Sequence, residues 1–421
     1  MKKIKPLLLA VFNSATLSGG NRRAFEFLRR GKSEGIDYII VTSPRSFKNA
    51  VKMFSDYRET ISNYKVYMKD FKERQSSISG LKQAFTYENV LRSALSVSKI
   101  AVDEDADLIV GGEEPESLFT SYLAGKFCSK PWTAVFQPCS DLLQPSSSIS
   151  SLTPFNILKF VSKKPSAKNL SLLSRIGLAL ELFAQLKIAQ KSLMLSVSSS
   201  VIEELHFLNP AIKFYAIKPG NGIDFEKFAT KFDITFEYDA VFFAWLVPEK
   251  GLYDLPIIWK YVTKRIPKAV LGVAGITEDQ KHISRFLGMV SKFRLSRNMV
   301  FLGELKEDAL KNLIRSSKLT LYPSLLDSFS LVTLESLACG TPVVAYDIAA
   351  IKHNFGKCDA VLRCRIKDKN SMAEKALAIL KNDNLRAILS KKAREYAANY
   401  DWKDVVKAEK EAYTKAIDHF S

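Results

Sequence analysis

The sequence predicts an α/β protein with two Rossmann-like domains, each a parallel sheet covered by helices. Short apolar runs alternate with helix-competent stretches along the chain, which is typical of doubly wound α/β proteins. This alternation starts twice, near residue 7 and again near residue 240, and the polar piece 227–238 separates the two series. The length of 421 residues is too great for one ordinary core, and predicts two domains of roughly 200 residues. We expect the two domains to face each other across a cleft.

The first half is expected to begin with a buried strand at residues 7–12 and a polar loop that closes on Gly19 and Gly20. A helix at 21–34 follows. A strand, a glycine pair and a helix in this order can bring backbone N–H groups close to a phosphate, although a tight turn without a ligand explains the same residues. The remaining elements of this half are expected as helices at 81–103, 116–127 and 198–205 and strands at 36–42, 106–110, 132–137 and 193–197.

Two segments of the first half depart from this alternation. Residues 43–80 are basic and polar without firm periodicity, and we expect a mobile excursion there. Residues 154–191 carry seven lysines and arginines against the single acid Glu181, interleaved with apolar residues. A basic, broadly apolar helix of this kind can lie in a membrane interface, whereas a core helix with a solvated basic face has the same composition. The charges exclude a membrane-spanning segment.

The second half repeats the alternation of strands and helices. We place the domains at residues 1–228 and 239–400, and we expect 401–421 to form a C-terminal helix that could cross back to the first domain. The strands of the second half are expected at 240–246, 269–273, 299–301, 319–322 and 343–346, and its helices at 252–266, 279–294, 306–316 and 331–339, with a largely helical remainder from residue 371.

The stretch 319–347 forms a predicted βαβ unit. Its first strand ends at Pro323, and the helix-competent run from Leu331 stops at Gly340 before the second strand. In such sheets ligands bind outside the carboxyl ends of the strands, where helix N-termini direct N–H groups outward. Asp327 and Glu335 lie eight residues apart at this edge. We therefore expect an anionic ligand, with one carboxylate near its phosphate and the other near its polar end.

Charge and cysteine content narrow the classes of partner. The net charge of +18 indicates nucleic acid, a phospholipid surface or a phosphorylated substrate, although solvated surface lysines explain it equally well. No nucleic acid is expected, because the basic residues are dispersed and form no aromatic–basic recognition module. The five cysteines include no CxxC pair, which favours reduced, buried thiols in a cytoplasmic protein. The apolar run near the first residue is too short to span a membrane and lacks a convincing cleavage site.

Several motifs occur in the order and spacing of a known family. They are Gly19–Gly20, Gly220-Asn-Gly-Ile-Asp224, Val247-Pro-Glu-Lys-Gly251, Tyr322-Pro-Ser324, and the pair Asp327 and Glu335 with Gly340 and Pro342-Val-Val-Ala345 after it. In these residues the chain resembles the large family of retaining glycosyltransferases of GT-B fold that use nucleotide-sugar donors, the glycosyl transferases group 1 or family 4-like enzymes. The resemblance covers nearly the whole chain and is strongest from about 219 to 347.

The resemblance implies a role for each matching residue. Lys250 would contact the donor diphosphate. Backbone amides at the helix start would contact it as well, and these belong to Ser328, Phe329, Ser330 and Leu331. Gly19 and Gly20 would form the N-terminal glycine loop. Glu335 would accept hydrogen bonds from the ribose hydroxyls, and Asp327, as a catalytic-site residue, from hydroxyls of the transferred sugar. The pair could otherwise be a helix N-cap and a solvated glutamate.

Three positions differ from the family pattern. Gln137, assigned here to the catalytic site, occupies the position where the family often has a histidine, and it can hydrogen-bond a sugar hydroxyl but cannot carry a proton. Ala244-Trp245 occupies the usual Gly-Arg position, so one phosphate clamp is missing. Ser330 occupies a position where glycine is common.

The predicted function is the transfer of a sugar from a nucleotide-diphosphate-sugar donor to an acceptor hydroxyl with retention of anomeric configuration. No metal site and no cofactor are expected, since no DxD-like motif lies in a plausible place. The segments 154–191 and 43–80 favour a lipid-linked or membrane-surface glycan acceptor, and peripheral association of a cytoplasmic protein with an anionic membrane. The alternative is a catalytically degenerate GT-B subunit that binds nucleotide-sugar or serves as a scaffold, which Gln137 and Trp245 favour.

Overall fold

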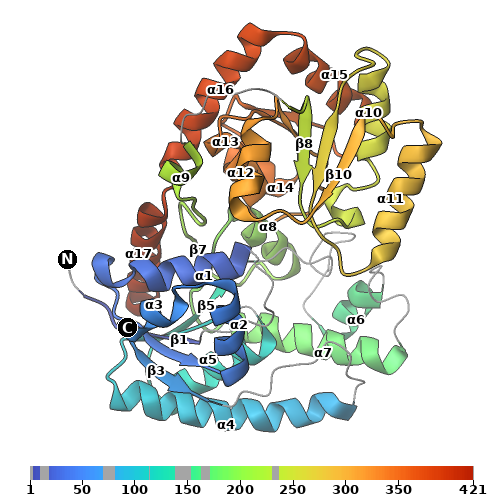
Figure 1. The fold of residues 1–421 in the computed structure, drawn as a ribbon. Helices are drawn as coiled ribbons and strands as arrows, with labels where there is room; N and C mark the ends of the chain where they lie inside the picture. Colours follow the sequence, from blue (N-terminus) through green and yellow to red (C-terminus); the bar gives the residue numbers. More distant parts are fainter. Residues whose placement is uncertain are drawn as a thin grey trace. The chain divides into compact units, whose positions relative to one another are not determined.

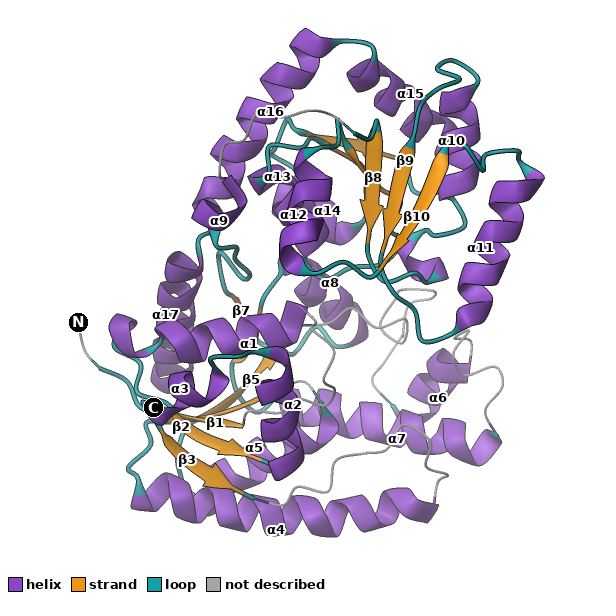
Figure 2. Ribbon diagram, viewed as in Figure 1, coloured by secondary structure: helices purple, strands orange, loops and turns teal. Residues whose placement is uncertain are grey.

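The computed structural model describes residues 3–9, 19–69, 81–112, 114–137, 153–162, 171–229 and 237–420. By its internal contacts the chain divides into two compact units. Unit 1 contains residues 1–220 and 403–421, and unit 2 contains residues 221–402. Each unit is built on one parallel sheet with helices packed against it (Figures 1 and 2). The α/β class predicted from the sequence is therefore confirmed.

Unit 1 contains a seven-stranded sheet in the order β3-β2-β1-β4-β5-β6-β7, with every pair parallel. Its strands are β1 Pro6–Leu9, β2 Ile39–Thr42, β3 Lys65–Met68, β4 Leu108–Gly112, β5 Trp132–Phe136, β6 Met194–Ser196 and β7 Phe214–Ala216. Its helices are α1 Gly19–Arg30, α2 Pro44–Met53, α3 Tyr57–Ser62, α4 Leu81–Asp103, α5 Pro115–Cys128, α6 Pro154–Ser162, α7 Leu172–Ala189, α8 Ser199–Leu208 and, apart from its first residue, α17 Trp402–Phe420.

The prediction of a mobile excursion at residues 43–80 is wrong for its described part. Residues 44–68 form α2, α3 and β3, and β3 pairs with β2. Ser43 caps α2 by accepting a hydrogen bond from the Ser46 amide, and Pro44 occupies the first turn. The strand β3 shows no apolar alternation because it is an edge strand with exposed and half-buried residues. Residues 70–80 lie outside the described part.

The basic segment 154–191 forms two helices over its described residues rather than one. The helices α6 and α7 pack against each other, and their inner residues Ile157, Phe160 and Leu186 belong to the core of unit 1. Other apolar side chains point outward: Phe155 is 73% exposed and Leu173 is 76% exposed. The segment therefore combines a core-facing side with exposed apolar side chains.

The two ends of unit 1 in the sequence are joined by a buried ion pair. The Arg23 guanidinium on α1 donates to Glu409 of α17 at 2.5 Å, and its Nε donates to the Gly220 carbonyl at 2.8 Å. Only 2% of the Arg23 side chain and 1% of the Glu409 side chain are exposed. The Lys410 ammonium also donates to the Glu34 carbonyl at 2.9 Å. These contacts fix α17 to the first helix of unit 1.

Unit 2 contains a six-stranded parallel sheet in the order β10-β9-β8-β11-β12-β13. Its strands are β8 Ala240–Phe243, β9 Leu271–Ala274, β10 Met299–Gly303, β11 Thr320–Tyr322, β12 Val343–Tyr346 and β13 Val361–Cys364. Its helices are α9 Phe225–Ala229, α10 Leu255–Thr263, α11 Gln280–Lys292, α12 Glu307–Arg315, α13 Leu331–Ala338, α14 Ala349–Phe355, α15 Lys369–Leu380 and α16 Asp383–Ala397. The predicted βαβ unit at 319–347 is present as β11, α13 and β12, and one continuous apolar core lies around these strands.

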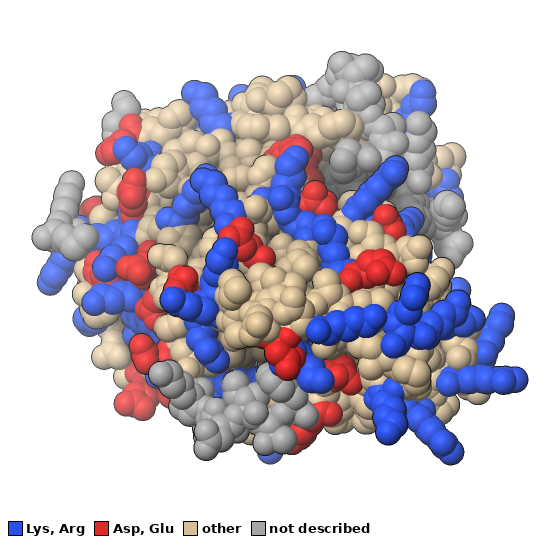
Figure 3. All heavy atoms as spheres, turned by 90° about the horizontal axis from the view of Figure 1, so that it is seen from above, with Lys and Arg blue, Asp and Glu red and all other residues tan. Residues whose placement is uncertain are grey.

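Basic side chains are spread over the surface. On the face drawn in Figure 3, lysines and arginines are interleaved with carboxylates and are denser toward one edge.

Candidate functional site

The strand order of unit 2 defines where a ligand would bind. The central strands β8 and β11 are neighbours, and from them the chain continues to β9 on one side and to β12 on the other. The connections that follow β8 and β11 therefore lead to opposite sides of the sheet from the carboxyl ends of these strands. In open α/β sheets this switch point is the crevice in which ligands bind. Lys250 follows β8 and Asp327 follows β11, so both lie at this edge.

The loops after β8 and β11 are joined by close backbone contacts. Gly251 has a φ of +79°, and a Cβ at this position would lie 2.0 Å from the Pro323 carbonyl oxygen. The Leu325 amide donates to the Glu249 carbonyl at 2.8 Å. Only glycine fits where one backbone approaches another this closely with a positive φ. The lysine loop is therefore held directly against the loop that carries Asp327.

Lys250, Tyr322 and Asp327 form one hydrogen-bonded cluster. The Lys250 ammonium donates to Asp327 Oδ2 at 3.0 Å and to the Leu326 carbonyl at 2.9 Å. The Tyr322 hydroxyl donates to the same Asp327 oxygen, and the Ser328 amide donates to the other at 2.8 Å. The Lys250 side chain is 22% exposed and the Asp327 side chain 18% exposed, so solvent still reaches the cluster. Asp327 thus already accepts from three donors.

The charges in this cluster stabilise each other. Burial alone would raise the pKa of the Asp327 carboxyl, but the Lys250 charge and the hydrogen bonds from Tyr322 and Lys250 outweigh burial and lower that pKa. Burial alone would lower the pKa of Lys250, yet Tyr322 and Asp327 raise it above its usual value. The pKa of Tyr322 is also raised, mainly by burial. At neutral pH the cluster therefore contains an ammonium, a carboxylate and a neutral phenol.

The residues between Asp327 and the helix hold the start of α13 in a defined conformation. Ser330 is the N-cap, and its hydroxyl accepts from the Thr333 amide at 3.3 Å. Its φ of 76° is unusual for a residue other than glycine, which explains physically why glycine suits this position. Phe329 is buried against Phe355 and Tyr400. The Leu331 amide then begins a helix whose first N–H groups have no partner within the helix.

Glu335 lies on the second turn of α13 and is partly exposed. Of the predicted donor-site residues in unit 2, the structure brings Lys250 and Asp327 into direct contact, and it places Ser328, Phe329, Ser330 and Leu331 on the backbone that leads from Asp327 into α13. Trp245 and Ala244 follow β8 on the same edge and are partly exposed.

The predicted residues of unit 1 also lie at or near carboxyl ends of its strands. Gly19 and Gly20 are the first residues of α1, the helix that follows β1. Residues 10–18, which connect β1 to α1, lie outside the described part. Gln137 directly follows β5 and is partly exposed. The neighbouring strand β4 ends at Gly112, so the switch point of unit 1 lies between β1 and β4.

The sequence interpretation missed two residues. The Tyr322 hydroxyl contacts Asp327, and a tyrosine at the end of a predicted strand that precedes an acid by five residues was the available signal. Glu114 is the N-cap position of α5, two residues after β4, and burial raises the pKa of its carboxyl. The signal for Glu114 was an acid two residues after a glycine pair at a strand end. Within the described residues, no group of three or more His, Cys, Asp or Glu side chains could hold a metal ion.

The comparison with known families gives a match that covers this edge of unit 2. Residues 224–396 match the family described as glycosyl transferases group 1. These residues form a group 1 glycosyltransferase domain. The domain contains Lys250, Tyr322, Asp327 and Glu335, and therefore the whole cluster at the switch point of unit 2.

Curated relatives of the group 1 domain match parts of the chain. An N-acetyl-alpha-D-glucosaminyl L-malate synthase of Bacillus anthracis is 30% identical over 117 residues, which is 28% of this chain and 30% of that protein. A phosphatidyl-myo-inositol mannosyltransferase of Mycolicibacterium smegmatis is 29% identical over 156 residues, which is 37% of this chain and 39% of that protein. The chain thus spans well under half the length of these relatives.

Solved structures resemble the fold over nearly the whole chain. The sucrose-phosphate synthase of Thermosynechococcus elongatus superposes with a TM-score of 0.69 at 15% identity and covers 98% of this chain and 99% of its own. Anabaena HepE, solved in complex with UDP, gives a TM-score of 0.68 at 14% identity and covers 98% of this chain and 100% of its own. These neighbours are glycosyltransferases of GT-B fold, so the predicted fold class is confirmed beyond the group 1 domain. None of the helices in the described part is sufficiently long and apolar to cross a bilayer.

Proposed function

We propose that this protein transfers a sugar from a nucleotide-diphosphate-sugar to an acceptor hydroxyl with retention of anomeric configuration. The observation that carries the proposal is the joined pair of loops at the switch point of unit 2, which holds the Lys250 ammonium beside the start of α13. A cation and a helix N-terminus on one edge suit a diphosphate. Membership of residues 224–396 in the group 1 family and the UDP complex of a structural neighbour support the same donor class.

In this proposal the chain's own residues neutralise the departing diphosphate. Lys250 supplies a positive charge, and the first amides of α13 supply N–H donors that need no reorganisation during the reaction. An ammonium group has three N–H donors, and Lys250 already contacts Asp327 and Leu326, so a phosphate oxygen would share or replace one of these contacts. Glu335 would bind the ribose hydroxyls. No metal ion and no cofactor take part in the proposed reaction.

We propose a wider role for Asp327 than a contact to the sugar alone. Its carboxylate accepts hydrogen bonds from Tyr322, Lys250 and Ser328. An ionised carboxylate has about four lone-pair sites, so a group of this kind can accept from protein donors and from a sugar hydroxyl. We therefore assign Asp327 two tasks, which are to hold Lys250 in place and to accept one hydrogen bond from the transferred sugar.

A lipid-linked or membrane-surface acceptor remains our proposal for the second substrate. The outward apolar residues of α6 and α7, Phe155, Leu172, Leu173 and Leu180, occur together with Lys159, Arg175 and Lys187. Apolar side chains among lysines and arginines suit an interface with anionic lipid. The relative from Mycolicibacterium smegmatis, whose name specifies a phosphatidyl-inositol, supports this acceptor class. Gln137 would then hydrogen-bond the acceptor or the sugar.

A donor screen tests the activity. Purified full-length protein would be incubated with UDP-, GDP- and ADP-sugars, and release of the nucleoside diphosphate would be measured for the wild type, for Glu335→Ala and for the control Glu374→Ala. Glu374 is an exposed glutamate on α15, away from the switch point. We expect turnover with one donor, loss of that turnover in Glu335→Ala and no change in Glu374→Ala. Equal rates in wild type and Glu335→Ala would contradict the ribose contact.

The alternative function is a degenerate subunit that binds nucleotide-sugar without turnover. Two observations favour it: Gln137 at the end of β5, where the family often has a histidine, and Trp245 after β8, where it has an arginine. Nucleoside diphosphate binding that depends on Lys250, combined with no release from any donor in the screen, would support the alternative over the transferase.

Sedimentation with anionic liposomes tests the membrane part separately. We expect the wild type to sediment at low salt and the variant Leu172→Ser with Leu173→Ser to stay in the supernatant. The control is Leu287→Ser, since Leu287 is an exposed leucine on α11 of unit 2. If all three proteins stay in the supernatant, membrane association is wrong, and the donor screen still decides the transferase.

A further inference from the structure

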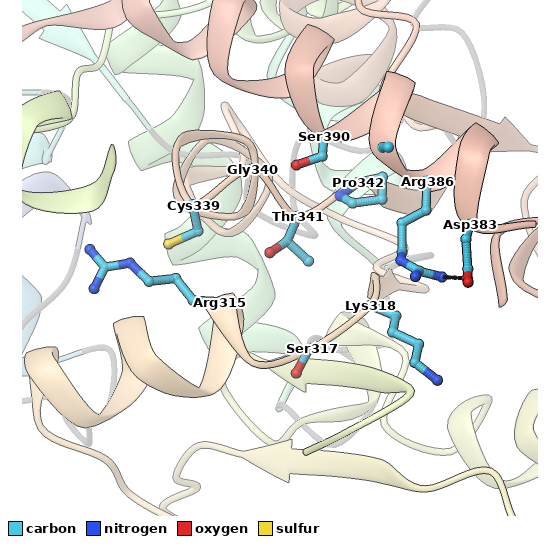
Figure 4. A pocket seen from close by; sticks show the side chains of 11 residues that line it. Arg315, Ser317, Lys318, Cys339, Gly340, Thr341, Pro342, Asp383, Arg386 and Ser390 are labelled. Carbon is cyan, nitrogen blue, oxygen red and sulfur yellow. Dashed lines mark ion pairs between the residues drawn. The ribbon is translucent and has the colours of Figure 1, made fainter. Parts of the chain in front are cut away.

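A cavity lies in unit 2, at the opposite edge of the sheet from Lys250. It has a volume of 180 Å³ and is bounded by the residues before β11, by the turn between α13 and β12, and by the first two turns of α16 (Figure 4). These residues lead into the amino ends of β11 and β12, whereas Lys250 and Asp327 lie beyond the carboxyl ends of β8 and β11. The cavity is therefore separate from the proposed donor site.

Basic side chains outnumber acidic ones in the lining of this cavity. Lys318 and Arg386 lie at one end, where Asp383 is the one acid among the lining residues (Figure 4). Arg315 lies at the other end, and its guanidinium donates to the Lys227 and Phe228 carbonyls. The Ser317 and Thr341 hydroxyls donate to the Leu313 and Ile314 carbonyls. Lys318 and Arg386 are the cations of this lining that suit the oxygens of a phosphate.

The acid beside Arg386 can give way to a ligand. Arg386 forms an ion pair with Asp383 at 2.7 Å, but the Asp383 side chain is 84% exposed while that of Arg386 is only 14% exposed. An ion pair with one partner so exposed contributes little, because water solvates the freed carboxylate. Lys318 pairs with Asp239 at 2.7 Å, and an ammonium keeps further N–H donors beside that contact. A bound anion would thus replace the exposed Asp383 carboxylate as the partner of Arg386.

A third guanidinium lies directly behind the turn that bounds the cavity. Arg394 of α16 packs on Gly340, where an added Cβ would lie 2.7 Å from the Arg394 Cζ, and Gly340 has a φ of +77°. Among the described residues, no acceptor lies within hydrogen-bond distance of the buried Arg394 Nε. A buried N–H without an acceptor is costly, and a nearby anion would reduce that cost by its charge.

From these observations we propose that this cavity binds a small phosphate-bearing anion between Arg386 and Lys318. Its volume of 180 Å³ is large enough for inorganic phosphate or pyrophosphate. The helix α13 reaches from Ser330 of the proposed donor site to Cys339 of the cavity, so the bound anion contacts the same helix as the donor.

Calorimetric titration of the full-length protein with inorganic phosphate and with pyrophosphate tests the proposal. The titrations use a Lys250→Gln background, so that the proposed donor site contributes little phosphate binding. Arg386→Gln removes a cationic donor, and Ala387→Phe narrows the cavity at an exposed lining residue without a change of charge. The matched control is Lys391→Gln, since Lys391 is on the same helix and 80% exposed.

We expect phosphate to bind in the Lys250→Gln background and in the control, and to bind about tenfold more weakly after either Arg386→Gln or Ala387→Phe. Phosphate affinity that is unchanged in both of these variants would overturn the proposal. The absence of any phosphate or pyrophosphate binding in the Lys250→Gln background would do the same. The donor screen does not depend on this result, because Glu335 and Lys250 decide the transferase.

Discussion

The two units share one topology but differ in what their sheets carry at the switch point. Both sheets have the strand order of a Rossmann fold around a central pair, β1 and β4 in unit 1 and β8 and β11 in unit 2. In unit 2 the central loops hold an ammonium and a carboxylate in contact. In unit 1 the described residues at the corresponding strand ends are glycines, Glu114 and Gln137. Among the described residues, the switch point of unit 2 therefore carries an ammonium–carboxylate contact, whereas the strand ends of unit 1 carry glycines, a glutamate and an amide.

From this difference we infer that the strand topology determines where a ligand binds, and that the side chains at the strand ends determine which chemical class of ligand binds there. A fixed cation and a helix N-terminus suit the diphosphate of a donor, whereas glycines and an amide suit the close approach of neutral hydroxyls. The units also differ in continuity along the chain. Unit 2 is one continuous segment, but unit 1 includes residues 403–421, which the buried Arg23–Glu409 pair fastens to α1.

Glu409→Gln is expected to have the largest effect, and only on unit 1. The substitution leaves the buried Arg23 guanidinium without its counter-charge, which costs about 3–5 kcal/mol. Urea unfolding followed by hydrogen exchange would report on peptides from each unit. We expect α1 and α17 to lose protection while the strands of unit 2 keep theirs. The control Asp404→Asn breaks an exposed pair with Lys407 on the same helix and should cost less than about 1 kcal/mol.

The double variant Arg23→Met with Glu409→Leu sharpens this test. We expect it to lose little free energy of unfolding, because apolar residues of similar volume can replace a buried ion pair. Equal stability of Glu409→Gln and wild type would show that the pair does not hold the two ends of unit 1 together.

Lys250→Gln compares the two switch points directly. Loss of the one charge beside the diphosphate should lower kcat/KM by roughly 100- to 1000-fold, as for removal of a donor that stabilises a developing negative charge. Gln137→Ala in unit 1 should cost only about tenfold, since one neutral hydrogen bond is lost. The measurement is steady-state transfer with the donor found by the screen. Similar losses in the two variants would contradict a charged donor edge and a neutral acceptor edge.

The sequence predicted the parts of this fold that depend on local patterns. Apolar runs and their breakers located β11, α13 and β12, because buried parallel strands read as continuous apolar segments and glycine or proline ends a helix. The order of motifs indicated the group 1 family, which the match at residues 224–396 bears out. The exposed edge strand β3 was missed, since a strand without a buried face shows no apolar alternation.

The contacts that shape the site could not be predicted in the same way. The loops after β8 and β11 are about seventy residues apart in the chain, and their joining depends on Gly251 meeting Pro323 in space. Likewise, the hydrogen bond from Tyr322 to Asp327 requires a turn geometry that spacing alone does not specify. Asp327 and Glu335 were chosen because they match a family pattern, and their roles remain predictions.

Ser330 offers a smaller test of the unit 2 edge. Its φ of 76° is strained for a side chain with a Cβ, while its hydroxyl caps α13. Ser330→Gly relieves the strain and loses the cap, so we expect stability within about 0.5 kcal/mol of wild type. Ser330→Ala keeps the strain and loses the cap, at a cost of about 1–2 kcal/mol. Thermal unfolding of both variants measures the difference, and an alanine variant as stable as the glycine variant would contradict this account of the turn.

The smallest expected effect concerns Glu104, which joins the edge of unit 1 by accepting from Lys65 at 2.6 Å and from Tyr67 at 2.5 Å. The hydrogen bonds from Lys65 and Tyr67 outweigh burial and lower the pKa of this carboxyl from 4.5 to about 2. A lowered folded-state pKa means that the stabilisation is complete above the unfolded value and is lost as the pH falls from about 4.5 toward 2.

Glu104→Gln should therefore flatten the acid dependence of unit 1 stability in that range, and its cost should be greatest near neutral pH and vanish as the pH falls toward about 2. Asp308 of unit 2 provides the matched control, since the hydrogen bond from Lys311 lowers the pKa of its carboxyl as well. Asp308→Asn should leave the acid dependence of unit 1 unchanged when hydrogen exchange is followed in peptides around β3. An identical acid dependence of unit 1 stability in Glu104→Gln and wild type would show that the Lys65 and Tyr67 contacts do not stabilise this edge of the sheet.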